Sequence, residues 1–276
     1  MGTYKEIRGT HIVSVTSDPP SPVNGQMWYN STDKVIKGFT SNPAGSWSSG
    51  GALNTGGIFG TSNGFGTQST GGVAGRLQEA GPSPGQKANT ELYNGTSWTE
   101  SGDLGTARNG AAVGGTYTSA LHAGGQEPTK STKTESWNGS SWTEVNDLNN
   151  ARRSNSGAGT STNAVAMGGY DGTSVGFTEL WNGSSWTEVA DNPSTGGGAA
   201  FGVYNDALLA QGTTTTLWNG TAWSTTTSGS SSASNRAGLG TTPAGLKTGG
   251  EPPNAGVTAT EEWIAPTTST VTFTVS

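Results

Sequence analysis

Acidic residues recur at fixed places along this chain, and they are the side chains best suited to chemistry. Three times over, a glutamate lies two residues after a tryptophan and an aspartate five residues after it: Glu100 and Asp103, Glu144 and Asp147, Glu188 and Asp191. Two carboxyl groups at the right separation hydrolyse glycosidic bonds. Acids that repeat in register more often support loops or solvate a sheet face, so we expect structural roles for them and no catalytic residue.

Other catalytic and metal chemistries lack the residues that they need. The chain has no cysteine, which excludes disulfides, thiolate catalysis and cysteine-ligated zinc. A copper site of the galactose-oxidase type needs two histidine ligands, but His11 and His122 fall on opposite sides of the expected domain boundary. Because His122 precedes Ala123-Gly124-Gly125 on an expected strand, we favour a packed or hydrogen-bonded role for it. We expect no enzyme activity, no metal and no cofactor.

The composition is typical of an all-β chain. Only 30% of the 276 residues are hydrophobic and 12% are charged, whereas 46 are glycine and 10 are tryptophan. This mixture predicts many short strands with tight turns around an aromatic core. A net charge of -6 without a basic stripe argues against binding to nucleic acid. We expect no membrane insertion, because no apolar stretch approaches the roughly 20 residues that cross a bilayer.

A repeat of strands and hairpins organises most of the chain. Its most regular part is Asn-Gly-x-x-Trp, whose tryptophans are Trp98, Trp142, Trp186 and Trp223, at spacings of 44, 44 and 37 residues. Each unit predicts an inner strand, a second strand ending in glycines, and a third and fourth strand joined by a type I′ turn at Asn-Gly. The glycine pairs are Gly124-Gly125, Gly168-Gly169 and Gly249-Gly250, with Gln211-Gly212 in the remaining unit. Four-strand repeats of this length are typical of propeller blades.

Tryptophans are expected to supply the packing that scarce aliphatic side chains do not. Trp181 and Trp186 flank one Asn-Gly turn, which predicts that they lie close across the strands and pack against the neighbouring blade. The aromatic positions of the repeat are Trp47, Trp98, Trp137, Trp142, Trp181, Trp186, Trp218, Trp223 and Trp263.

A strand that ends in Gly-Gly, followed by an aromatic residue and a tryptophan about five residues later, resembles the kelch repeat over residues 47–263. The resemblance implies a β-propeller but no particular activity. The last unit stops after Trp263 without a fourth strand, while Trp47 stands alone with Leu53 at the offset that separates Trp98 from Leu104. We predict that the Trp47 strand completes the Trp263 blade. Residues 46–265 would then form a closed five-bladed propeller, with six blades as the alternative.

Residues 1–45 do not follow the repeat. They predict a strand, a proline-rich turn, and a hairpin of QMWYN and KVIKGF joined across STD. Asp-Pro-x-x-Pro followed by Gly-x-x-Trp-Tyr-Asn resembles the N-terminal module of structural proteins from tailed bacteriophages, and kelch-like arrays after it resemble a type frequent in marine phages. The resemblance implies that this module attaches to other virion proteins. Residues 266–276 alternate strictly and are expected to add a strand to the hairpin or to a second copy in a homo-oligomer.

The loops of the expected propeller favour recognition. Second-to-third and fourth-to-first connections emerge on the same face of a blade, and the second-to-third loops are long and unlike one another. A rigid scaffold with divergent loops suits ligand binding, although drift on an unused surface is the alternative. The side chains expected to contact a glycan are Gln126, Lys130, Lys133, Tyr170, Asp171 and Asn254.

Three arginines fall between blades, namely Arg108, Arg152 and Arg153. They could bind an acidic ligand or pair with acids such as Asp103 and Asp147, and we favour pairing. The whole pattern predicts a non-enzymatic bacteriophage virion protein, such as a tail fibre, that recognises a bacterial surface polysaccharide. The alternatives are a purely structural capsid or tail decoration protein and, with less support, a glycan-cleaving enzyme.

Overall fold

The computed structural model describes residues 13–19, 26–38, 51–59, 64–67, 69–79, 84–229, 237–248 and 260–264. These residues form strands, turns and loops and contain no helix, so the all-β prediction is confirmed for them. The chain divides into two compact units, Met1–Ser48 with Pro266–Ser276 and Ser49–Ala265. The predictions for Trp47, for the glycine pair at 249–250 and for the strand at 266–276 lie outside the described residues.

The first unit contains the predicted hairpin within a three-stranded sheet. Strand β2 (Met27–Asn30) pairs antiparallel with β3 (Val35–Gly38) and parallel with β1 (Val13–Val15). The turn between β2 and β3 is closed by Asn30, whose Oδ1 accepts hydrogen bonds from the amides of Thr32 and Asp33 at 3.0 Å each.

One carboxylate links the two motifs of this unit. Asp18, from Asp-Pro-x-x-Pro, accepts hydrogen bonds from Trp28 Nε1 at 2.9 Å, Asn30 Nδ2 at 3.0 Å and Lys37 Nζ at 2.8 Å. The hydrogen bond from Lys37, followed by those from Asn30 and Trp28, lowers the pKa of Asp18 from 3.8 to about 2. The motif residues are therefore parts of one hydrogen-bonded cluster.

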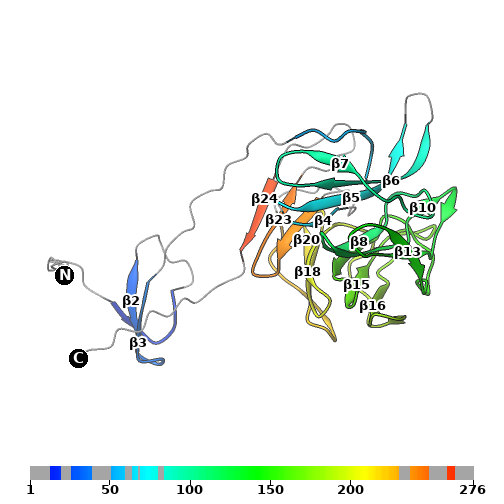
Figure 1. The fold of residues 1–276 in the computed structure, drawn as a ribbon. Coiled ribbons are helices and arrows are strands. Elements are labelled where there is room, and N and C mark those ends of the chain that lie inside the picture. Colours follow the sequence, from blue (N-terminus) through cyan, green and yellow to red (C-terminus); the bar gives the residue numbers. More distant parts are fainter. Residues whose placement is uncertain are drawn as a thin grey trace. The chain divides into compact units, whose positions relative to one another are not determined.

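The described part of the second unit contains five antiparallel sheets of three or four strands, which follow one another along the chain (Figure 1). We number them sheets 1 to 5. Sheets 1 to 4 have four strands each, and the described part of sheet 5 has three. Sheet 1 comprises β4 (Gly64–Gly66), β5 (Gly71–Gln78), β6 (Gly85–Tyr93) and β7 (Trp98–Glu100). Sheet 2 comprises β8 (Ala112–Thr116), β9 (Ser119–Ala123), β12 (Thr134–Trp137) and β13 (Trp142–Val145).

The remaining sheets repeat this order. Sheet 3 comprises β14 (Ser156–Gly159), β15 (Ala164–Met167), β16 (Thr178–Trp181) and β17 (Trp186–Glu188). Sheet 4 comprises β18 (Ala199–Val203), β19 (Asp206–Gln211), β20 (Thr214–Trp218) and β21 (Trp223–Thr225). Sheet 5 comprises β22 (Ala237–Thr241), β23 (Ala244–Thr248) and β24 (Thr260–Ile264). A small hairpin of β10 (Gln126–Glu127) and β11 (Thr129–Lys130) lies in the loop between β9 and β12.

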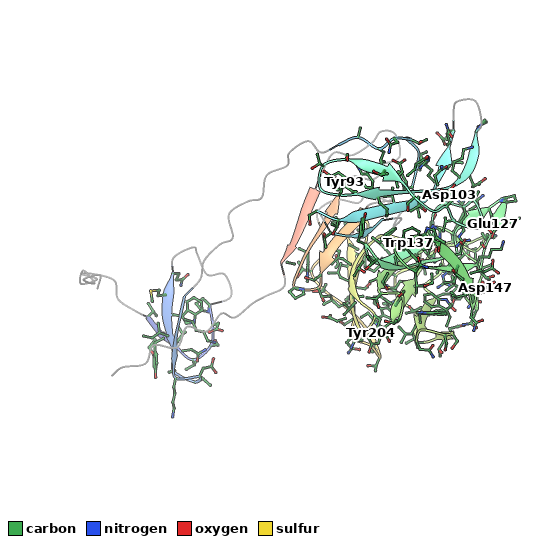
Figure 2. The ribbon with its side chains drawn as sticks, in the orientation of Figure 1. Tyr93, Asp103, Glu127, Trp137, Asp147 and Tyr204 are labelled. Carbon is green, nitrogen blue, oxygen red and sulfur yellow. The ribbon has the colours of Figure 1, made fainter. Side chains whose placement is uncertain are left out.

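The first strands of successive sheets contact one another. Strand β4 contacts β8, β8 contacts β14, β14 contacts β18, and β18 contacts β22. Each buried apolar cluster accordingly draws on two neighbouring sheets, as where Phe65 of sheet 1 meets Trp137 and Trp142 of sheet 2. Trp137 lies among the packed strands (Figure 2). This succession of sheets is propeller-like.

The hairpins between third and fourth strands occur where they were predicted, but their turn type differs. Trp181 pairs with Trp186, so four residues form the loop. Within this loop only Gly183 has a positive φ, of 94°. The Oδ1 of Asn182 accepts hydrogen bonds from the two amides that follow Gly183, at 2.9 Å each. The type I′ prediction is therefore wrong, because the asparagine side chain caps a longer loop.

The two tryptophans of each hairpin have different partners. Trp181 and Trp186 lie with ring centroids 5.4 Å apart, as predicted. Trp181 Nε1 donates to Ser161 O, in the first turn of its own sheet, at 2.8 Å. Trp186 Nε1 donates to Thr134 Oγ1, in the preceding sheet, at 3.0 Å. Equivalent bonds to the preceding sheet join Trp142 to Thr90 and Trp223 to Thr178.

Buried ion pairs fasten the connections that lead into successive sheets. Arg108 lies 2.9 Å from Glu135, and Arg152 contacts Glu179, all four side chains being buried. The predicted pairing of these arginines is confirmed, but their partners are third-strand glutamates. Asp103 and Asp147 instead accept hydrogen bonds from the amides that begin the buried parts of the third strands, at Thr90 and Thr134. The glutamates thus pair with arginines of the connection that enters their own sheet. The aspartates lie in the connection that leaves a sheet and bond to the third strand of that sheet.

Residues 51–59 make the same contacts with sheet 1 that the connection at 146–153 makes with sheet 3. Asn54 donates its backbone N–H to Glu91 Oε2 at 2.8 Å and its side-chain amide to Trp98 O at 2.9 Å. Asn149 makes the same two contacts, to Glu179 Oε2 at 2.8 Å and to Trp186 O at 3.2 Å. Residues 51–59 therefore contact sheet 1 in the same way as a connection between two sheets does.

Breaking one buried ion pair should destabilise the second unit strongly. We expect Arg152→Ala to lower the free energy of unfolding by about 3–5 kcal/mol, because Glu179 would keep a buried charge without its partner. The double variant Arg152→Ala/Glu179→Thr should lose less than the sum of the two single losses, since no lone charge remains. Denaturant unfolding followed by tryptophan emission measures these values. The half-exposed pair Lys133–Glu127 is the control, where single alanine variants should cost about 1 kcal/mol or less. Additive losses at Arg152 and Glu179 would contradict the account.

The Asp18 cluster predicts a pH dependence for the first unit. Because the pKa of Asp18 is lower in the folded chain than its ordinary value of 3.8, its stabilising contribution is present above pH 3.8 and is lost as the pH falls towards 2. The NMR resonance of the Trp28 indole N–H, assigned with Trp28→Phe, reports this loss. Asp18→Ala should shift that resonance at neutral pH, whereas Asp191→Ala, at an exposed aspartate of the second unit, should leave it in place. An unchanged Trp28 resonance in Asp18→Ala would disprove the cluster.

Candidate functional site

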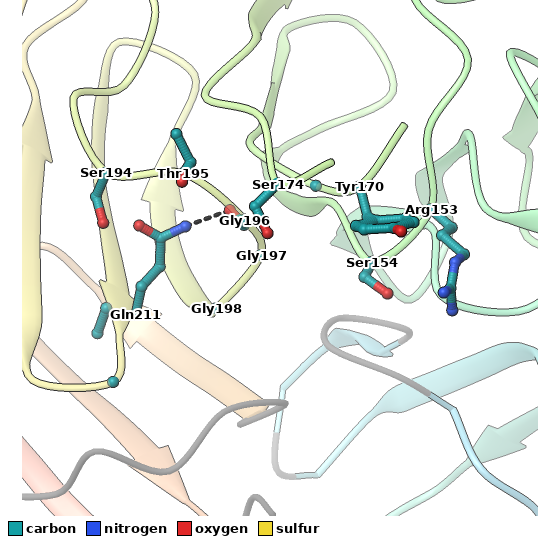
Figure 3. A pocket seen from close by; sticks show the side chains of 13 residues that line it. Arg153, Ser154, Tyr170, Ser174, Ser194, Thr195, Gly196, Gly197, Gly198 and Gln211 are labelled. Carbon is teal, nitrogen blue, oxygen red and sulfur yellow. Dashed lines mark hydrogen bonds between the residues drawn. The ribbon is translucent and has the colours of Figure 1, made fainter. Parts of the chain in front are cut away.

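A cavity of about 510 Å³ lies between sheets 3 and 4 (Figure 3). Its lining comes from two connections between sheets, at 153–154 and 194–198, from the second-to-third connection of sheet 3 at 169–174, and from the end of β19 with the turn after it, at 210–212. Fourth-to-first and second-to-third connections therefore meet on one face, as the repeat predicted. This cavity is the candidate functional site.

One wall of the cavity carries a cation stacked on an aromatic ring. The guanidinium carbon of Arg153 lies 5.0 Å from the centroid of the Tyr170 ring. Two backbone hydrogen bonds tie the same residues, from Arg153 N to Tyr170 O at 3.1 Å and from Tyr170 N to Arg153 O at 2.8 Å. Arg153 is exposed and makes no ion pair with any described residue. The preference for ion pairing is therefore wrong for Arg153, since its connection turns it out to the ring of Tyr170.

The opposite wall carries amide and hydroxyl groups. Figure 3 shows Ser194, Thr195 and Gln211 across the cavity from Tyr170 and Arg153. Gln211 Nε2 donates a hydrogen bond to Gly196 O, while its Oε1 is buried and has no hydrogen-bond partner among the described residues. A buried acceptor without a partner is uncommon in folded proteins. This wall therefore has hydrogen-bonding capacity that the chain itself does not use.

The cavity exists because sheet 4 departs from the repeat. Arg108 and Arg152 each lie ten residues after a hairpin tryptophan, and Gly196 occupies that place after Trp186. The third-strand glutamate is likewise replaced in sheet 4, by Thr216, whose Oγ1 accepts a hydrogen bond from Asn192 Nδ2 at 2.9 Å. Both members of the ion pair are absent together, which avoids an unpaired buried charge. Gly196 lines the cavity, so no arginine side chain extends from this position, while Thr216 stays buried beside Asn192.

The second-to-third connection of sheet 4 is also short. Gln211 pairs with Thr214, so only Gly212 and Thr213 join β19 to β20. In the strand register, Gln211 takes the place of Gly124 and Gly168, which begin the long loops of sheets 2 and 3. A glutamine side chain and a two-residue turn thus replace a glycine and a long loop, which leaves the cavity open on this side.

The residues predicted to bind a glycan are only partly brought together. Lys130 Nζ donates to the backbone oxygen of Asp171, next to Tyr170, so these three lie on adjoining loops of sheets 2 and 3. Lys133 Nζ contacts Thr106 Oγ1 at 2.9 Å and Glu127 at 3.4 Å. The backbone of Gln126 pairs with that of Asn109. Of the five that the structure describes, Tyr170 alone lines the cavity, and Asn254 lies outside the described residues.

Several residues of the cavity were not predicted, among them Ser154, Ser174, Ser194, Gly196 and Gln211. The signal that could have found them is the break in the repeat. Gln211-Gly212 stands where other units have Gly-Gly, and Gly196 stands where two connections have arginine.

The repeated acids lie away from this cavity. Glu100, Glu144 and Glu188 are exposed on fourth strands, where Glu100 accepts from Asn89 Nδ2 at 3.1 Å and Glu188 from Asn150 Nδ2 at 3.0 Å. No group of three histidine, cysteine, aspartate or glutamate side chains suited to a metal ion occurs within the described ranges.

His122 has the hydrogen-bonded core role that was favoured. It is fully buried on β9, and its Nδ1 accepts a hydrogen bond from Arg108 Nε at 3.1 Å. Burial, and next the positive charge of Arg108, hold the pKa of His122 well below its ordinary value of 6.5. The ring is therefore neutral at neutral pH and serves as an acceptor for the arginine that pairs with Glu135.

A scan of the sequence against protein-family models finds no match, and a search of curated proteins finds no similar sequence. Among the residues that the structure describes, no helix is long and apolar enough to cross a membrane.

Neutral, buried His122 predicts that the second unit loses stability on mild acidification. Below pH 6.5 the unfolded chain binds a proton at this histidine that the folded chain does not bind. The free energy of unfolding should therefore fall with decreasing pH, by up to about 1.4 kcal/mol per pH unit. Denaturant unfolding between pH 5 and 6.5 measures this slope above the titration of most carboxylates. His122→Gln should flatten the slope and His11→Gln should not. A slope that persists in His122→Gln would assign it to other groups.

Proposed function

We propose that this chain is a non-enzymatic virion protein of a tailed bacteriophage, such as a tail fibre, and that it recognises a bacterial surface glycan. The observation that carries the proposal is the cavity between sheets 3 and 4. It lies at the one position, among those compared, where the arginine and glutamate of the repeat are both replaced. A concave site with a few polar groups and an aromatic ring suits small-ligand binding.

The chemistry of the cavity favours binding over catalysis. Its lining contains one charged residue, Arg153, and no carboxylate or histidine from the described part of the chain. General acid–base or nucleophilic catalysis needs such groups within hydrogen-bonding reach of the substrate. Recognition needs only shape, hydrogen bonds and an aromatic face, which Tyr170 and the surrounding hydroxyl and amide groups supply.

A closed five-bladed propeller is the architecture that we propose for residues 46–265. Trp98 Nε1 donates to Gly51 O at 3.1 Å, as Trp223 Nε1 donates to Ala190 O at 3.1 Å, four residues after Trp186. Gly51 stands four residues after Trp47, so the Trp47 strand would be the fourth strand of the sheet before sheet 1. In a ring of five that sheet is sheet 5, whose described part has three strands. The six-bladed alternative would need a further sheet from outside the repeat.

Attachment through residues 1–45 completes the proposal. The Asp-Pro-x-x-Pro and Gly-x-x-Trp-Tyr-Asn motifs, which resemble those of tailed-phage structural proteins, meet at the Asp18 carboxylate. A compact unit of this kind would join the chain to other virion proteins, with the recognition unit displayed on the particle.

One observation favours the structural alternative, a capsid or tail decoration protein. Of the loop residues expected to contact a glycan, Lys130 and Lys133 already bond to groups of the chain itself. Such internal contacts are also expected of loops on an unused surface. This observation therefore supports a non-binding role for the second-to-third loop of sheet 2, and it does not bear on the cavity.

Adsorption to cells distinguishes recognition from decoration. We expect the fluorescently labelled full chain to bind saturably to at least one strain in a panel of candidate marine bacteria. Tyr170→Ala should weaken that binding about tenfold, through the loss of an aromatic contact surface. The matched control is Tyr204→Ala, because both tyrosines are 37% exposed. Tyr204 lies in the turn between β18 and β19, at the end of the strands opposite to the second-to-third connections.

Two outcomes would contradict the proposal. Folded protein that adsorbs to none of the strains would favour structural decoration. Equal losses for Tyr170→Ala and Tyr204→Ala would show that the cavity face has no special part in adsorption.

A further inference from the structure

We propose that the cavity between sheets 3 and 4 binds a sugar bearing a carboxylate, and that Arg153 is the residue that recognises the charge. This inference rests on the proposed recognition function of the same face and names its ligand class. It follows from the charge of the lining, from the way in which Arg153 is held, and from the hydrogen-bonding groups opposite it.

The charge of the cavity is positive and unbalanced. Arg153 is the only charged residue in the described lining. The nearest acid in sequence to the ring, Asp171, accepts hydrogen bonds from the amide and hydroxyl of Thr173, and these and the charge of Lys130 hold its pKa below the ordinary value. Asp171 is thus already compensated by other groups. A guanidinium presents paired N–H donors that match a carboxylate, and such charge-assisted bonds are stronger than neutral ones.

Arg153 is held in place before any ligand binds. Its guanidinium stacks on Tyr170, and the two backbone hydrogen bonds between these residues fix the strand segments that carry them. The next residue, Ser154, has a left-handed backbone with φ of 54°, at the place where the preceding connection has Gly110 with φ of 67°. Ser154 N donates to Gly110 O at 2.6 Å, which secures this conformation.

A left-handed backbone is costly for a residue with a side chain and persists only where the surroundings fix it. At Ser154 it places a hydroxyl in the cavity lining where the repeat would have a glycine. Pre-organised groups lose less entropy on binding, so this wall is suited to hold a small ligand.

The facing wall suits a ligand with many hydroxyl groups. Gln211 Oε1 is buried at this wall without a hydrogen-bond partner, so a small rotation of the side chain that exposes it to a ligand hydroxyl would give it one. Ser174, Ser194 and Thr195 add further hydroxyls to the lining. A volume of about 510 Å³ falls within the usual range for small-ligand sites. A sugar ring with one carboxylate, as in a uronic acid, could bind Arg153 through the carboxylate and the facing wall through its hydroxyl groups.

NMR titration of the full chain tests the inference with matched sugars. The probes are D-galacturonate, D-glucuronate and D-mannuronate, each against its neutral counterpart, D-galactose, D-glucose or D-mannose, with acetate as the control for charge alone. We expect at least one uronate to bind about tenfold or more tightly than its neutral partner and than acetate, since the difference is one charge-assisted contact in a partly exposed site.

Two substitutions locate the contact. Arg153→Gln should abolish the preference for the uronate, whereas Lys87→Gln, the same loss of charge on β6 of sheet 1, should retain it. Gln211→Gly, which restores the residue that the repeat has at this place, should weaken both members of the preferred pair.

Each other outcome would overturn the inference. Equal affinity for a uronate and its neutral partner would leave a glycan site without charge recognition, and the proposed function would stand. A preference that survives Arg153→Gln would place the charge contact elsewhere. Failure of all three uronates to bind would reject the ligand class, while cell adsorption that depends on Tyr170 would still decide the proposed function by itself.

Discussion

In sheets 2, 3 and 4 the hairpin between the third and fourth strands places an indole N–H between sheets, and a threonine of the preceding sheet accepts its hydrogen bond. Trp142, Trp186 and Trp223 reach Thr90, Thr134 and Thr178 in this way. An unpaired N–H in the interior would cost a substantial part of the free energy of folding. The contact therefore fixes how neighbouring sheets pack, and it lets large aromatic rings fill an interior poor in aliphatic side chains.

The features set by neighbouring residues could be predicted from the sequence. The third and fourth strands, their Asn-Gly loops and the paired tryptophans lie within about ten residues of one another, and all were predicted. Features set by distant residues could not. The partner of Arg152 lies 27 residues away, on a strand whose inward face is defined only by packing. The turn type was not predicted either, because the dipeptide Asn-Gly occurs both in type I′ turns and in longer loops that the asparagine side chain caps.

The candidate site was more difficult to predict than the fold, because it lies where the arginine and the glutamate of the repeat are replaced. Tyr170 was predicted from its loop, but Gly196 and Thr216 matter through the arginine and glutamate that they replace. Losing both members of a buried ion pair costs far less than losing one. The same scaffold therefore has a buried ion pair at the connection between sheets 2 and 3 and a cavity between sheets 3 and 4.

Hydrogen–deuterium exchange of the full chain with surface polysaccharide from an adsorbing strain would show which end of the sheets in the propeller-like unit the ligand protects. We expect slower exchange in 169–174 and 194–198, two of the segments that line the cavity. Protection confined to the first-to-second turns, at 117–118, 160–163 and 204–205, would place recognition at the opposite end of the strands and would disprove recognition by the cavity.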